Sequence, residues 1–280
     1  MASRLLSPLV VLLAAFASYQ LLYPPSTTTV NMSGNEMKAF EDPKVLGYVQ
    51  KIQQVATPER PALASARAGW AMAWLHLVVW NSFKSAYFYA DKYEKDDFQN
   101  YVDYALLSAE FLVGHHDAEE SSLFPVIEKK VPGSMDKNEA QHQSFLKELG
   151  QLVDYLKSAK PDTFDASKYR AQIDTILAPI MEHLADELDT LAPSELLKHF
   201  TEEELADINK ATHKAQQGQT ENAKSLPFLL QNLPPGSPFP PAPKFVTNLL
   251  GPWVFYWKYS PLWKYTAYPF KPVLPTSVPQ

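Results

Sequence analysis

The sequence contains no cysteine among its 280 residues. Disulfides, thiolate nucleophiles, zinc–thiolate sites and iron–sulfur clusters are therefore excluded, and any metal must be held by His, Asp or Glu side chains. Glycine is scarce, at nine residues, and the chain has no glycine-rich phosphate loop, nucleophile elbow or zinc-protease motif. The net charge of −6, with acidic and basic residues interspersed, provides no basic surface, so nucleic acid is not expected as a partner.

One long uncharged run, Leu5 to Tyr23, lies near the N-terminus behind Arg4. At 1.5 Å per residue it is long enough to cross a bilayer core of roughly 30 Å. Arg4 on its N-terminal side favours a body that is lumenal or extracellular, where the sequon at Asn31 could be glycosylated. The sequence therefore predicts a single-pass membrane protein, or a secreted one if the segment is cleaved after the small-x-small motif ending at Ala17.

Four segments in the middle of the chain have apolar residues at the three- and four-residue spacing of amphipathic helices. Pro125 and Pro179 fall inside the second and fourth segments and predict a kink or bend there. Short connections between long helices make them antiparallel neighbours, so the sequence predicts an all-α, up-down four-helix bundle over residues 65–191. The four segments are Ser65 to Lys92, Phe98 to Lys130, Asp136 to Ser158 and Ala166 to Leu191.

The segments outside the bundle differ in composition from it. We expect an anchor or signal segment at 1–25, a juxtamembrane spacer with a lead-in helix at 26–64, and peripheral helices at 192–225. The extension at 226–280 is rich in proline and aromatic residues and is expected to be irregular, apart from a short helix near 245–259. Its aromatic side chains could strap it across the bundle or lie at a membrane interface.

Two His-x-x-x-Glu pairs occur in the predicted helices, His115 with Glu119 and His183 with Glu187. Residues i and i+4 share a helix face, so each pair can offer a nitrogen and a carboxylate to one metal ion. His142 lies in the third helix, and counting from the turns puts all five side chains near one height of the bundle. Histidines and carboxylates from three helices therefore predict an interior metal site.

The other histidines are expected to lie outside this site. His116 and Glu120 overlap the first pair and are expected on the adjacent face, in solvent or in contacts around the ligands. His199 and His213 belong to the peripheral helices and are expected at the surface.

Three segments together, HHDAEESSLFP, EAQHQSF and MEHLADE, resemble the hemerythrin-like HHE cation-binding family. The tail, from LPFLLQNLPP through SPLWKYTAYPFKP, looks like the C-terminal extension of its filamentous-fungal branch. The resemblance implies a hemerythrin-like bundle with a di-iron centre. It implies one histidine from the first helix, His-x-x-x-Glu from the second, His-x-x-x-His from the third, and a histidine with a carboxylate from the fourth.

Five positions of this sequence match the family's ligand pattern and two do not. Trp80 stands where the first helix should supply a histidine, and Leu146 where the third should supply its second. His76 shares the face of Trp80 but lies one turn, about 5.4 Å, away. The five matching ligands could still hold one ion of iron, manganese or zinc, and the two missing histidines put a second ion in doubt. The matching ligands are His115, Glu119, His142, His183 and Glu187.

Three functions remain open at this stage. The first is a membrane-tethered hemerythrin-like protein that binds iron or dioxygen at a partly degenerate site. The second is a small-molecule enzyme, or an accessory factor in fungal secondary-metabolite biosynthesis, with Trp80 and Leu146 lining a reused pocket. The third is a structural or interaction protein in which the site is a relic. Protein partners, and whether the chain is an enzyme, are not predicted.

Overall fold

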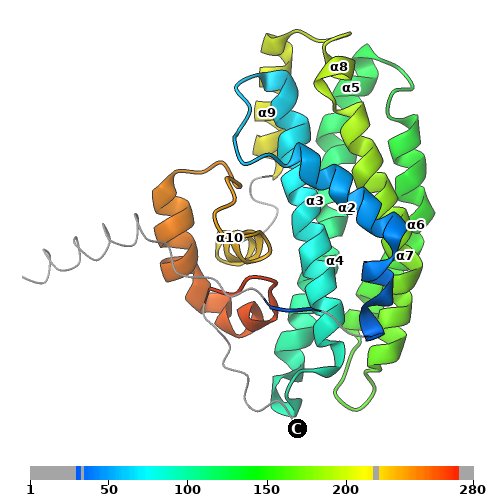
Figure 1. Ribbon diagram of the computed structural model, residues 1–280, viewed down its shortest axis with the longest axis vertical. Coiled ribbons are helices and arrows are strands. Elements are labelled where there is room, and N and C mark those ends of the chain that lie inside the picture. Colours follow the sequence, from blue (N-terminus) through cyan, green and yellow to red (C-terminus); the bar gives the residue numbers. More distant parts are fainter. Residues whose placement is uncertain (1–29, 33–34, 217–220, 271–280) are drawn as a thin grey trace, which may run out of the picture.

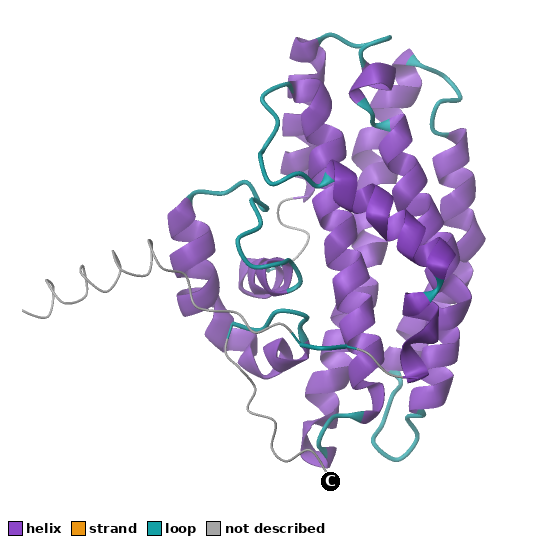
Figure 2. Cartoon of the chain, in the orientation of Figure 1, coloured by secondary structure: helices purple, strands orange, loops and turns teal. Residues whose placement is uncertain are grey.

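The computed structural model describes residues 30–32, 35–216 and 221–270, and the regular structure of these residues is helical throughout (Figure 2). Four long helices run up and down beside one another and form the main body (Figure 1). The predicted all-α, up-down bundle is therefore confirmed. Its helices are α3 (Ala64–Phe88), α4 (Phe98–Ala118), α6 (Asp136–Lys157) and α7 (Ala166–Thr190).

Local side-chain contacts fix several helix ends. The Asp42 side chain caps α2 (Pro43–Val55) by accepting hydrogen bonds from two backbone N–H groups of its first turn, and Asp165 caps α7 in the same way. The turn between the second and third bundle helices contains Gly133 at φ 82°, a conformation that glycine adopts without strain. The Gly133 N–H donates to the Glu128 carboxylate at 2.8 Å.

The second bundle helix is interrupted where Pro125 predicts a kink. Proline has no N–H to donate, so the Ser121 carbonyl loses its usual α-helical partner. The chain responds with one π-helical turn, η4 (Glu119–Leu123), in which the first N–H of α5 (Phe124–Lys130) donates to the Glu119 carbonyl. Glu119 therefore lies at the start of a π turn, a feature that is frequent at functional sites.

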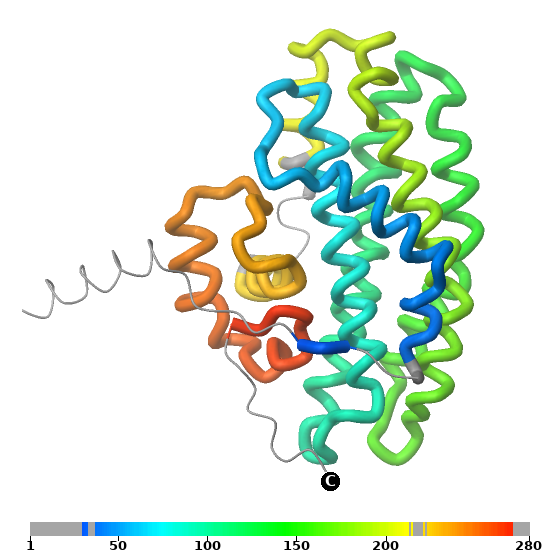
Figure 3. The backbone as a smooth tube through the Cα atoms, in the orientation of Figure 1, coloured from blue at the N-terminus to red at the C-terminus, as the bar shows by residue number. Residues whose placement is uncertain are grey.

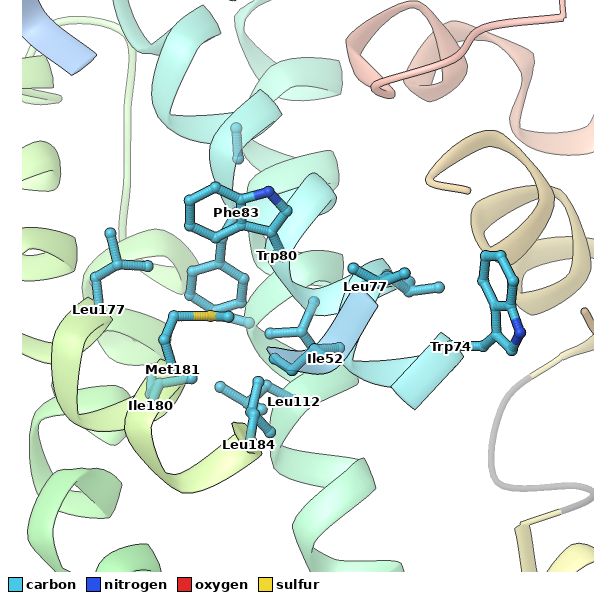
Figure 4. Close-up of a cluster of buried hydrophobic side chains, with 14 of the residues drawn as sticks. Ile52, Trp74, Leu77, Trp80, Phe83, Leu112, Leu177, Ile180, Met181 and Leu184 are labelled. Atoms are coloured by element: carbon cyan, nitrogen blue, oxygen red, sulfur yellow. The ribbon is translucent and has the colours of Figure 1, made fainter. Parts of the chain in front are cut away.

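The bundle core is apolar, and a fifth helix closes one side of it. Helix α2 crosses α3 and α7 obliquely (Figure 1) and contributes the fully buried Ile52 to the core. Figure 4 shows Ile52 among Trp80 and Phe83 of α3 and Met181 of α7. These side chains are at most 6% exposed, so the core is continuous from α2 into the bundle.

The extension is more helical than predicted, because π-helical and 3-10 segments accommodate its prolines. Pro252 lies in a π-helical segment and Pro261 in a 3-10 segment. The extension folds beside the bundle (Figure 3). The elements outside the bundle are η1 (Asn35–Glu41), α8 (Pro193–Leu196), α9 (Glu202–Gln216), α10 (Asn222–Gln231), η5 (Val246–Phe255) and η6 (Tyr256–Tyr265).

The extension contacts the bundle through aromatic packing and hydrogen bonds. The Tyr265 ring packs 5.6 Å from the ring of Tyr101. The Tyr265 hydroxyl donates to the Asp97 carboxylate, and the Ser85 hydroxyl donates to the Tyr265 carbonyl. Trp263 is fully buried. Of the two interpretations of the aromatic residues, these contacts favour a strap across the bundle.

The predicted single-pass membrane localisation is contradicted by the structure. In the ranges that the structure describes, no helix has both the length and the apolar character that a membrane span requires. The run from Leu5 to Tyr23, on which the prediction depended, lies outside these ranges. Asn31 is exposed, but its glycosylation was expected only in the membrane topology and is likewise not supported.

Candidate metal centre

Seven buried side chains from all four bundle helices converge in the interior. They form two groups of four, and in each group the candidate ligand atoms lie within 4.8 Å of one another. None of the seven residues is more than 6% exposed. Glu119 belongs to both groups. The first group is His116, Glu119, His142 and His183, and the second is His76, His115, Glu119 and Glu187.

The first group brings two imidazole nitrogens face to face. Nε2 of His142 lies 2.9 Å from Nε2 of His183 and 3.6 Å from Oε2 of Glu119. The His116 ring lies 4.1 Å from the His142 ring, between centroids. Two nitrogens bound at about 2.1 Å to one ion at a right angle would be about 3 Å apart. The spacing of these nitrogens therefore fits shared ligation of a metal ion.

The second group uses the other oxygen of the shared carboxylate. Nε2 of His115 lies 3.0 Å from Oε1 of Glu119, and Nε2 of His76 lies 3.2 Å from Oε2 of Glu187. Glu119 thus directs Oε1 toward the second group and Oε2 toward the first. This is the geometry of a bridging carboxylate.

Two histidines of the first group are held from outside by polar neighbours. Nδ1 of His142 lies 2.7 Å from Oε1 of Glu120, whose side chain is partly exposed. Nδ1 of His183 lies 3.4 Å from Oε1 of Gln141. Acceptors at Nδ1 favour the tautomer with its proton there, which leaves the Nε2 lone pair for the interior. Glu120 therefore makes a contact around the ligands, one of the two outcomes expected for it.

Burial suppresses charge on the groups of this centre. Desolvation lowers the pKa of the His115 imidazole to about 4, and it lowers the pKa values of His76, His116 and His183 well below their usual range. Neutral imidazoles are the form that binds metal. Desolvation also raises the pKa of the Glu187 carboxyl to about 7. Without a cation, burial therefore disfavours the ionised form of Glu187, which is the form that binds a metal.

Several nitrogen and oxygen atoms that could bind a metal make no hydrogen bond in the described structure, although some of them lie 3.0–3.2 Å from one another. They include both ring nitrogens of His76 and His116 and both carboxylate oxygens of Glu119 and Glu187. Burying polar atoms without partners is costly. These orphaned atoms, all nitrogen or oxygen, fit a divalent cation such as iron, manganese or zinc.

Helical spacing explains why the second helix supplies three of the seven side chains. His115 and His116 precede Glu119 by four and three residues, and both spacings put side chains on one helix face. The two imidazoles therefore lie on opposite sides of Glu119, one in each group. Of the two outcomes expected for His116, solvent or contacts around the ligands, its exposure of only 2% excludes the first.

The five residues proposed from sequence all lie in this interior cluster, and two further members were not predicted as ligands. His116 could have been found from its i, i+3 spacing to Glu119, and His76 only from the relative heights of the packed helices. Trp80 packs on Phe40, with ring centroids 5.1 Å apart. Leu146 is half-buried. His199 is exposed as expected, and the side chain of His213 lies outside the described part of the chain.

Phe145 rather than Leu146 packs against the first group. Its ring centroid lies 5.3 Å from that of His116 and 5.9 Å from that of His183. Phe124 stacks on His142 at 5.6 Å, and both phenylalanines are only 1% exposed. The first group is therefore bounded by aromatic rings that keep water away from it.

The protein is an up-down helical bundle in which every bundle helix contributes a buried histidine or glutamate to the interior. It therefore belongs to the class of helical bundles with a candidate His/carboxylate metal centre. Residues 90–204 match the family model described as the Hemerythrin HHE cation binding domain. This match confirms, over these residues, the resemblance to the HHE cation-binding family that was predicted from the sequence. His76 precedes the matched residues.

A curated relative matches over part of its length. It is the dimeric xanthone biosynthesis cluster protein R11 of Cryptosporiopsis sp., which is 32% identical over 158 residues. The aligned region covers 54% of this chain and 59% of the relative. A search of solved structures found no match.

Proposed function

We propose that this domain holds two metal ions bridged by Glu119, that the ions are iron, and that the centre handles dioxygen. The observation that carries the proposal is the sharing of Glu119 between two buried groups, with one carboxylate oxygen directed at each. A cluster around a single ion would have no use for the second group. The sequence left open whether the site holds one or two ions, and the two groups favour two.

The proposal requires a complete set of donors, and His76 and His116 supply what Trp80 and Leu146 lack. The resemblance implies five histidines and two carboxylates, and the seven buried residues comprise the same number of each. Imidazole and carboxylate ligands suit iron, with manganese and zinc as alternatives. Bound iron would supply redox chemistry toward dioxygen.

The surrounding residues have definite tasks in this proposal. The outer contacts of His142 and His183 direct their Nε2 lone pairs inward. Glu119 and Glu187 must release their protons to bind metal, so ion uptake is coupled to deprotonation. Phe124 and Phe145 exclude water from the first group.

A second candidate function concerns the setting in which such a centre would work. The curated relative is named for a dimeric xanthone biosynthesis cluster. That name supports a role in fungal secondary-metabolite biosynthesis, as an enzyme or an accessory factor acting on a small molecule. Because the chain spans only 59% of that relative, the relative's activity does not transfer with the alignment.

Metal analysis of the purified full chain, loaded anaerobically with ferrous iron, tests the dinuclear proposal. We expect about two irons per chain in the wild type and about one in His76→Ala and in His116→Ala, because each variant removes a ligand from one group only. Glu119→Gln should lose most of both. His199→Ala, at an exposed histidine, is the matched control and should keep both irons.

The folded state of each variant is checked by its helical circular dichroism, so loss of metal is separated from loss of fold. Folded wild-type protein that takes up no metal would refute the proposal. One iron per chain that neither His76→Ala nor His116→Ala removes would refute the bridge.

A further inference from the structure

We propose that a pocket beside the candidate metal centre binds a planar aromatic anion, such as an aromatic carboxylate or a fused-ring phenolate. The pocket has a volume of about 310 Å³ and lies between α3, α9, η4 and the loop that carries Phe239. Ligand pockets for small organic molecules begin at about this volume. Binding itself does not depend on the proposed function, but a reaction of the bound molecule would.

The position of the pocket links it to the centre. Met72 and Leu123 line it, and they are four residues from His76 and Glu119 respectively. Residues four apart on a helix lie one above the other, about 6 Å apart along the axis. One wall residue from α3 and one from η4 therefore lie within about one turn of a candidate metal ligand.

The floor of the pocket is apolar and aromatic. The rings of Trp70 and Phe239 meet edge to face, with centroids 6.0 Å apart. The Trp70 indole N–H already donates to the Thr57 carbonyl at 2.9 Å, so the ring offers the pocket apolar surface. Met72 and Leu123 are 5% and 3% exposed. Flat aromatic rings are the shape that such a floor accommodates best.

The rim of the pocket is cationic. Arg60, Arg67 and Lys210 line it, and none of the lining residues in the described part of the chain is acidic. Arg67 is held in place because it donates to the carbonyls of Pro61 and Ala62, at 3.0 and 2.5 Å. Three cations beside an apolar floor select a ligand with an aromatic body and a negative group at its edge.

One lining residue offers a further polar contact. The Thr212 hydroxyl oxygen is buried and has no hydrogen-bond partner in the described part of the chain. A hydroxyl can both donate and accept, so a phenolic hydroxyl of the ligand would satisfy it. The favoured ligand is therefore an aromatic anion that also carries a hydroxyl group.

Calorimetric titration of the full chain with 3-hydroxy-2-naphthoate tests the inference, with the methyl ester as a neutral ligand of nearly the same shape. We expect the naphthoate to bind about tenfold more tightly than the ester, because the ester lacks the charge that the rim recognises. The double variant Arg60→Gln/Lys210→Gln should lose about tenfold in affinity for the naphthoate only. Lys214→Gln, one turn further along α9 and outside the lining, should not.

A steric variant tests the location independently of charge. Ala206 lines the pocket from α9 and is exposed, so Ala206→Trp fills the space without disturbing the core and should abolish binding. Equal affinity for naphthoate and ester, unchanged binding in Ala206→Trp, or no binding up to about 1 mM would each overturn the inference.

The titration is repeated on chelator-treated protein, with metal content measured on the same samples. We expect naphthoate affinity to change less than threefold without metal, because none of the described residues that line the pocket is a candidate metal ligand. Protein with two irons and no naphthoate binding would overturn this inference and leave the proposed function standing. Protein that binds naphthoate but takes up no iron when loaded with it would overturn the proposed function and leave this inference standing.

Discussion

The burial of Glu187 leads us to expect that this residue destabilises the metal-free protein and, under the proposed function, stabilises the metal-bound one. Burial raises the pKa of this carboxyl from 4.5 to about 7. At 1.36 kcal/mol per pKa unit, this shift corresponds to about 3 kcal/mol of lost folding stability once the group is ionised. Burial also raises the pKa of the neighbouring Glu119 carboxyl, and the negative charge of Glu187 raises it further. The substitution Glu187→Gln removes both penalties at nearly constant side-chain volume.

The sign of the effect depends on pH. Below pH 4.5 the carboxyl is protonated in both the folded and the unfolded chain, so the variant and the wild type should be equally stable. As the pH rises, the unfolded chain releases the proton first, and the wild type loses stability until the pH passes the folded pKa of about 7. In chelator at pH 8, Glu187→Gln should therefore be more stable than the wild type by about 3 kcal/mol.

Urea unfolding from pH 4.5 to 8, with and without iron, measures this effect. With iron at a hundred times its Kd, the wild type should gain about 2.7 kcal/mol per site, while the variant has lost a ligand. The order of stabilities should therefore reverse. Glu182→Gln on the same helix is the control, since Glu182 is partly exposed and its ion pair with Lys44 should contribute less than about 1 kcal/mol.

A specific result would refute this reasoning. If Glu187→Gln is the less stable protein at pH 8 in chelator, the nearby His76 imidazole stabilises the ionised carboxylate, and the carboxylate is not destabilising there.

Three further predictions follow from individual contacts. Glu120→Gln should weaken iron binding about tenfold without changing the number of ions per chain, because it weakens the acceptor at His142 Nδ1; competition with a chelator measures this. Tyr265→Phe should lower the free energy of unfolding by about 1–2 kcal/mol in urea, because the Asp97 carboxylate loses a buried donor, whereas Tyr268→Phe should have a smaller effect. Iron binding at pH 6.5 should release more protons than at pH 8, by potentiometric titration, since Glu187 is already largely ionised at the higher pH.

The sequence predicted the bundle well because apolar periodicity and proline act locally. The second and third bundle helices begin at Phe98 and Asp136 as expected, and the break near Pro125 was anticipated. The extension was predicted less well. The prolines predict no regular helix there apart from a short one near 245–259, whereas the chain uses π-helical and 3-10 turns around Pro252 and Pro261.

The two members of the cluster that the sequence did not predict, His116 and His76, were missed for different physical reasons. The i, i+4 rule found Glu119 from His115 but overlooked the equivalent i, i+3 relation to His116. His76 could not be placed at all, because its height relative to Glu187 depends on how α3 slides along α7. The relative height of the two helices is set by the packing of their whole faces, so it cannot be predicted from the sequence of one helix.

Trp80 and Leu146 stand where the family's pattern has histidines. The interior cluster nevertheless contains as many histidines and carboxylates as that pattern implies. Metal binding depends on the number and type of ligand atoms around the ion, whereas a motif specifies only positions along the chain. Here the first helix supplies its imidazole one turn earlier, from His76, and the second helix supplies through His116 the imidazole that the third does not. If this argument is right, His76→Ala and His116→Ala should each remove one iron, although neither position belongs to the pattern that the resemblance implies. Trp80→His in the His76→Ala background should not restore the lost iron, because residue 80 lies a helical turn away, in the apolar layer against Phe40.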